Sequence, residues 1–67
     1  MTVVKIIELL GESETSWEDA AKSALDQAAK TLRGIVGLDV VHFTCKVKDN
    51  KIVKYRANVK CAFKYEN

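Results

Sequence analysis

The C-terminal part of the chain alternates between two kinds of side chain, and this alternation restricts the fold more than any other feature. Every second position is apolar or aromatic: Val53, Tyr55, Ala57, Val59, Cys61, Phe63 and Tyr65. The positions between them are mostly basic or polar: Ile52, Lys54, Arg56, Asn58, Lys60, Ala62 and Lys64. Because successive side chains of a strand point to opposite faces of a sheet, residues 52–65 are predicted to form a long strand with one covered and one open face.

A second strand is expected before this one, because apolar residues recur there with the same period: Val41, Phe43, Cys45 and Val47. Asp49 and Asn50 mark a hairpin turn between the two strands. A two-residue turn would place apolar Cys45 opposite Lys54, so a three-residue turn at 49–51 is predicted instead. The expected pairs are Val47 with Val53, Cys45 with Tyr55, Phe43 with Ala57, and Val41 with Val59.

The two cysteines are expected to be small core residues and not a disulfide. In the predicted register Cys61 lies opposite Asp39, six residues from Cys45. At about 3.4 Å per residue the sulfurs would be roughly 20 Å apart, too far for a bridge. The chain shows no signal-peptide pattern and no run of about twenty apolar residues. We therefore expect a cytoplasmic protein that does not cross a membrane.

One further strand is predicted at residues 2–10, a run of mainly branched aliphatic residues that stops at Gly11. A helix should follow, starting near Trp17, with either Thr15 or Ser16 as its N-cap. Its apolar stripe is Trp17, Ala20, Ala21, Ala24, Leu25, Ala28, Ala29 and Leu32. Gly34 is expected to end the helix, and the alanines should let it lie close to a sheet.

Residues 1–67 thus predict a single domain of the α+β class with the order β-α-β-β. A three-stranded antiparallel sheet would pack on one amphipathic helix, with the C-terminal strand in the middle. The other sheet face would have no cover: Leu38, Val40, His42, Thr44, Arg56, Asn58 and Ala62. Because a core of this size supplies only about 3–5 kcal/mol, the exposed face and edges predict partner subunits.

The basic residues are concentrated in the C-terminal half. Residues 1–31 hold three basic and six acidic side chains, whereas 32–67 hold eight and three. A basic stripe is predicted on the open face: Lys46, Lys54, Arg56, Lys60 and Lys64. It could bind an anionic ligand or form salt bridges. Nucleic acid is not expected, because the aromatic residues Phe43, Tyr55, Phe63 and Tyr65 fall on the opposite face.

Catalysis is not expected either. His42 is the single histidine, and it is predicted to lie opposite Asn58 without an acid or nucleophile fixed nearby. An acidic group precedes and opens the helix: Glu12, Glu14, Glu18 and Asp19. Carboxylates of this kind suit Ca²⁺, with Glu12 and Glu14 as weak metal candidates, but acids are also favoured at a helix N-terminus.

Four segments together resemble the dodecin family of small bacterial and archaeal flavin-binding proteins. They are Val4–Gly11 (VKIIELLG), Ser16–Ala21 (SWEDAA), Thr31–Arg33 (TLR) and Tyr55–Phe63 (YRANVKCAF). The resemblance covers essentially the whole chain. It implies a βαββ subunit, a hollow homododecamer and a non-catalytic role in binding, storing or buffering a small ligand, with riboflavin, FMN or FAD as the family's ligands.

Two positions depart from that pattern. Flavin-binding dodecins stack the flavin on a tryptophan just after the helix, whereas this chain has Gly37 there, followed by Leu38. The family's flavin-contacting glutamine is replaced by Arg56. The resemblance is therefore nearest to the flavin-poor branch called calcium dodecins. It implies a ligand pocket lined by Gly37, Leu38 and Arg56 of neighbouring subunits, or a calcium-linked or ligand-free structural assembly.

Overall fold

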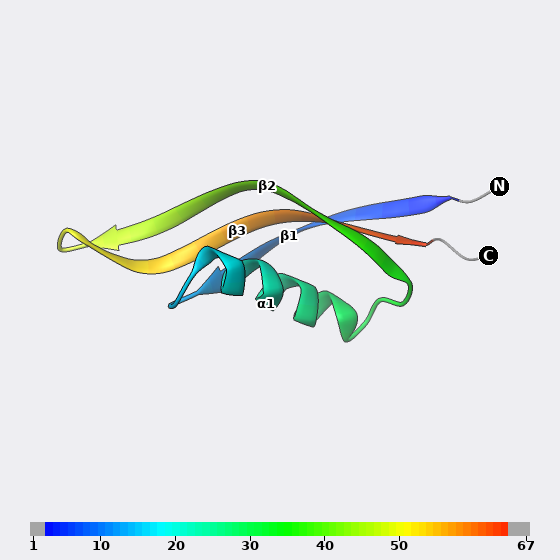
Figure 1. The fold of residues 1–67 in the computed structure, drawn as a ribbon, viewed down its shortest axis with the longest axis horizontal. Coiled ribbons are helices and arrows are strands. Elements are labelled where there is room, and N and C mark those ends of the chain that lie inside the picture. Colours follow the sequence, from blue (N-terminus) through cyan, green and yellow to red (C-terminus); the bar gives the residue numbers. More distant parts are fainter. Residues whose placement is uncertain (1–2, 65–67) are drawn as a thin grey trace.

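The computed structural model describes residues 3–64, which form one sheet with a helix against one face (Figure 1). The elements are β1 (Val4–Ser13), α1 (Trp17–Ala29), β2 (Ile35–Lys48) and β3 (Lys51–Lys64). The strand order is β1-β3-β2, and β3 is antiparallel to both neighbours. The α+β class, the element order and the central place of the last strand are confirmed. Tyr65 lies outside the described residues.

Strand β1 does not stop at Gly11, as predicted, but continues to Ser13. Gly11 pairs with Ala57, and a Cβ atom at Gly11 would stand 2.0 Å from the carbonyl oxygen of Ala20 and 3.0 Å from Cβ of Ala24. The glycine therefore admits the close approach of α1 to the sheet and does not break the strand.

Helix α1 is shorter than its apolar stripe suggested. Ser16 is the N-cap: its Oγ accepts a hydrogen bond from the Asp19 amide at 3.0 Å. The helix ends at Ala29, so the expectation that Gly34 ends it is wrong. Gly34 has a φ of 71°, and its carbonyl accepts a hydrogen bond from the Lys64 amide at 3.0 Å. The left-handed conformation of Gly34 thus turns the chain from the end of α1 onto the sheet, beside β3.

The core lies between α1 and the middle of the sheet and is built from small side chains. The buried apolar residues of the described chain are Ala20, Ala24, Ala28, Ala57, Val59 and Cys61. Both cysteines are free thiols. Cys61 is a core residue as predicted, but Cys45 is exposed. Cys45 pairs with Tyr55 at the level where β1 ends, whereas Cys61 lies on the part of β3 that the core encloses.

The hairpin turn contains two residues and not three. Lys48 pairs with Lys51, and Asp49 and Asn50 have φ values of 53° and 63°, as a type I′ turn requires. The predicted pairs of Cys45 with Tyr55 and Phe43 with Ala57 are nevertheless present. A bulge reconciles the two findings, because Val47 pairs with Ile52 and Val53 becomes the extra residue.

A second bulge, at Val41, alters the face assignment of the start of β2. Val40 pairs with Val59, where Val41 was expected, and Leu38 pairs with Cys61. Leu38 packs against the core, so placing Leu38 and Val40 on the open face was wrong. One extra residue reverses the alternation beyond it, which period-two counting along the sequence does not detect.

The close approach at Gly11 predicts a specific sensitivity. Gly11→Ala should lower the free energy of unfolding by about 1–3 kcal/mol, because its Cβ would collide with backbone atoms of α1. Denaturant unfolding at one fixed protein concentration measures the change. Gly37→Ala is the matched control: its Cβ would meet no atom nearer than 4.0 Å, so a change below about 0.5 kcal/mol is expected. Equal effects at the two glycines would contradict the account.

Candidate functional site

The sheet face away from α1 carries rows of side chains that cross all three strands, three of them with polar or charged members. The registers place Glu12, Arg56 and Thr44 in one row, then Leu10, Asn58 and His42, then Glu8, Lys60 and Asp39, then Ile6, Ala62 and Gly37. Side chains in one row are cross-strand neighbours on the same face. The predicted pairing of His42 with Asn58 is confirmed, and the rows define the open face.

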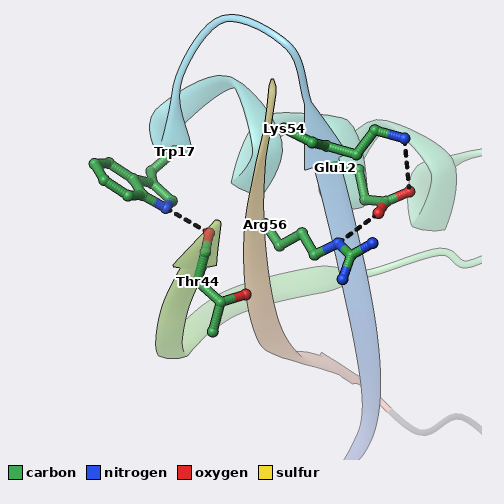
Figure 2. Close-up of polar contacts among 5 residues, drawn as sticks. All are labelled: Glu12, Trp17, Thr44, Lys54 and Arg56. Carbon is green, nitrogen blue, oxygen red and sulfur yellow. Dashed lines mark hydrogen bonds and ion pairs between the residues drawn. The ribbon is translucent and has the colours of Figure 1, made fainter. Parts of the chain in front are cut away.

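Arg56 is held by an acid from the neighbouring strand. Its Nε donates a hydrogen bond to Oε2 of Glu12 at 2.7 Å, and Nζ of Lys54 lies 3.9 Å from Oε1 of the same carboxylate (Figure 2). These side chains remain 37% to 40% exposed, so the ion pairs are worth only about 0–1 kcal/mol each. The Nε contact fixes the arginine, while its two terminal nitrogens donate no hydrogen bond to a residue of 3–64. Arg56 can therefore present them to an anion.

Asn58 is the one described residue with a buried side-chain oxygen that accepts no hydrogen bond. It stands on β3 between Leu10 and His42, next to Arg56 along the open face. A buried unpaired acceptor is unfavourable in an isolated subunit, and because the oxygen is itself covered, the Asn58 side chain would have to turn to meet a hydrogen-bond donor. Asn58 is thus a candidate contact that sequence reasoning missed. The alternation placed it on the open face but held no signal that its oxygen is unpaired.

The other two predicted ligand residues lie in a separate place. Gly37 and Leu38 line an open cleft of about 460 Å³ between the second half of α1 and the start of β2. Its remaining lining residues are Leu25, Asp26, Ala29, Ile35 and Val36. Gly37 has no positive φ, and a Cβ there would meet only the Cβ of Ala62, at an ordinary contact distance of 4.0 Å, so the fold does not require glycine there. The position is free to carry another side chain.

Gly37 and Arg56 do not meet within one subunit. Gly37 pairs with Ala62, which is six residues along β3 from Arg56, a separation of about 20 Å in an extended strand. Within one subunit, Gly37 therefore lies beside Leu38, whereas Arg56 lies beside Glu12 and Lys54. A pocket containing all three predicted ligand residues requires more than one chain.

Aromatic side chains gather on the opposite side of β3. The ring of Trp17 contacts Tyr55 edge-on at a centroid distance of 4.9 Å and Phe43 at 6.1 Å. Its Nε1 donates a hydrogen bond to the Thr44 carbonyl oxygen at 2.8 Å, on the other side of β3 from Arg56 (Figure 2). The single tryptophan thus fixes the start of α1 to β2 and is not on the open face.

The acidic residues around the helix start do not form a metal cluster. Within residues 3–64, no three His, Cys, Asp or Glu side chains are grouped as ligands of a metal ion. Glu12 faces Arg56 and Lys54, and Asp19 accepts hydrogen bonds from Ser13 at 2.7 Å and Thr15 at 3.3 Å. These two carboxylates are already engaged inside the subunit.

The whole described chain matches one protein family. Residues 3–66 match the family model described as Dodecin. This chain is a member of the dodecin family. The sequence is 33% identical over 64 residues to the calcium dodecin of Mycobacterium tuberculosis. The match covers 96% of this chain and 90% of that protein. Membership indicates a small ligand-binding protein.

Solved dodecin structures share the fold closely. A point mutant of the Thermus thermophilus dodecin is 30% identical, with a TM-score of 0.95 and full coverage of both chains. The calcium dodecin of M. tuberculosis, a calcium-chelating antigen with a calcium-binding site, is 31% identical with a TM-score of 0.84, covering 96% of this chain and 91% of that one. The dodecin of Streptomyces coelicolor has a TM-score of 0.95 at 21% identity, which supports the fold alone. Within residues 3–64 of this dodecin, no helix is long and apolar enough to cross a membrane.

Proposed function

We propose that this dodecin is a non-catalytic shell subunit that binds, stores or buffers a small ligand in the cytoplasm as part of a closed homo-oligomer, most simply a homododecamer. One observation supports the proposal: the candidate ligand residues fall into two separate groups, called half-sites here, Gly37 with Leu38 and Arg56 with Asn58. Gly37 and Arg56 lie about 20 Å apart along the sheet, so a ligand that contacts both half-sites would need more than one subunit. The free thiols of Cys45 and Cys61 are compatible with a reducing compartment.

Flavin is the proposed ligand by family membership, but no Phe, Tyr or Trp of residues 3–64 lies on the open face to stack on its ring system. Among residues 3–64 the aromatic side chains of Phe43, Tyr55 and Phe63 pair in register with residues of the helix-covered face, and Trp17 packs with them there. Gly37 offers space and no ring. The residues present therefore fit the charge of a flavin nucleotide, through Arg56, better than they fit its ring system.

Calcium is the second candidate, favoured by the calcium-binding site of the M. tuberculosis relative. Glu12 and Glu14 are the carboxylates proposed for it. Because Arg56 and Lys54 already neutralise Glu12, a calcium ion there would have to displace them or take oxygens from other subunits.

The assembly is tested by the solution mass. Light scattering behind size-exclusion chromatography should give about 90 kDa, twelve times the 7.5 kDa of one chain, because the open face and the small core require partners. A monomer at low micromolar concentration would overturn the proposal.

Flavin binding is tested by fluorescence titration with riboflavin, FMN and FAD. We expect weak quenching by the natural chain and affinity higher by roughly tenfold to a hundredfold in Gly37→Trp, because an aromatic ring restores stacking. Gly37→Leu is the matched control, since it fills the same space without a ring. Flavin fluorescence that stays unchanged with micromolar natural protein would reject flavin as its ligand.

The calcium alternative predicts a rise in the thermal midpoint with added CaCl₂, since an ion bound only by the native state stabilises it. That rise should be larger in Arg56→Gln, which frees the Glu12 carboxylate, and absent in Glu12→Gln. Lys60→Gln removes the same charge from the same strand and face and serves as the control. The same midpoint with and without calcium in every variant would reject the alternative.

A further inference from the structure

No other helix or strand of residues 3–64 pairs with the far end of the β2-β3 hairpin. The hairpin tip, defined here as residues 46–54, projects beyond the start of α1 (Figure 1). The last pair between β1 and β3 is Ser13 with Tyr55, so the two strands of the tip pair only with each other. An isolated two-stranded hairpin is marginally stable in water. The length of this one therefore indicates a contact outside the subunit.

The hairpin tip combines exposed apolar side chains with a positive charge. Val47, Ile52 and Val53 are 58%, 48% and 40% exposed, and the bulge places Ile52 and Val53 together opposite Val47. The same nine residues contain four lysines and one aspartate. Lys46, Lys48 and Lys51 form no ion pair with a described residue. The surface thus suits a partner that is both apolar and acidic.

The chain itself carries such a surface at the start of its helix. The acidic segment, residues 12–19, contains four acids and no base. Glu14 and Glu18 are exposed and form no ion pair with a described residue. Apolar surface lies beside them, because Trp17 is 38% and Phe43 is 52% exposed. The acidic segment therefore matches the hairpin tip in both charge and hydrophobicity.

We propose that the hairpin tip of one subunit docks on the acidic segment of a second copy. Lys48 and Lys51 meet Glu14 and Glu18, while Val47 and Val53 cover Trp17 and Phe43. Within one chain only Lys54, at the base of the tip, reaches the acidic segment, at Glu12. The contact is thus made between subunits. A second copy is favoured over a membrane or nucleic acid because the complementary charge and apolar floor are both present on this chain.

The inference rests on the assembly part of the proposed function. Charge-reversal variants distinguish a failure of this contact from a failure of the assembly itself. The hairpin variant carries Lys48→Glu and Lys51→Glu, the helix-start variant carries Glu14→Lys and Glu18→Lys, and a combined variant carries all four. Lys22→Glu with Lys30→Glu makes the same charge change as the hairpin variant on exposed positions of α1 and its C-cap. Solution mass is measured for each protein over a dilution series, with Trp17 emission as a second readout.

Each two-site variant should raise the concentration at which half of the assembly dissociates by roughly tenfold or more, because like charges then face each other. Trp17 emission should shift to the red at the same dilution. The combined variant should return to the natural value. An equal mixture of the two-site variants should recover part of the stability, because only contacts between unlike variants bring opposite charges together. The helix-start variant also weakens the N-terminus of α1, but the combined variant carries the same change, so its recovery reports the contact.

The outcomes distinguish the contact from the assembly. A monomeric natural protein would overturn both. A natural assembly whose hairpin variant dissociates no more readily than the Lys22 and Lys30 control would overturn the contact alone. A membrane role for the tip would also overturn the contact. In that case the natural protein would sediment with phosphatidylglycerol vesicles, whereas the hairpin variant would keep its mass and no longer sediment with them.

Discussion

The contact between α1 and the sheet at Gly11 is the constraint on which the rest of the subunit depends. The helix backbone lies so close to Gly11 that a Cβ would strike the Ala20 carbonyl, and the residues beneath and beside it are alanine and valine. A close, small-residue contact gives good packing but encloses little apolar surface. The helix therefore covers only the middle of one sheet face, and both the open face and the hairpin tip are left for other molecules.

This distribution of cover also explains where charge is tolerated. Arg56 and Glu12 sit in one cross-strand row of the open face, and Lys60 stands in register between Glu8 and Asp39. Acids on the neighbouring strands thus lie beside the basic stripe of β3. The sequence alone shows only the positive charges. The positive charge of Lys60 is therefore offset by acids of both neighbouring strands, whereas the terminal nitrogens of Arg56 extend past its acid partner and can meet an anion.

Periodicity predicted the sheet well where no residue is inserted. The alternation of residues 52–65 placed β3 in the middle and paired Cys45 with Tyr55, Phe43 with Ala57, and His42 with Asn58, as found. It failed at Val41 and Val53, because a bulge changes which residues face the core without changing the composition of the strand. Gly11 and Gly34 were misjudged for a related reason: glycine serves close approach and left-handed backbone as well as termination, and only tertiary contacts distinguish these uses. The unpaired oxygen of Asn58 has no counterpart in the sequence at all.

The separation of Gly37 from Arg56 has a thermodynamic consequence for any ligand that contacts both. The two residues lie about 20 Å apart along the sheet of one subunit, so a small molecule can reach both only where two chains meet. Such a ligand binds the assembly and not the isolated subunit, and by mass action it must then stabilise the assembly. The linkage is reciprocal: subunit contacts that hold such an assembly together would also raise its affinity for the ligand. A change at the hairpin tip, far from either half-site, would on this argument weaken ligand binding through the assembly alone.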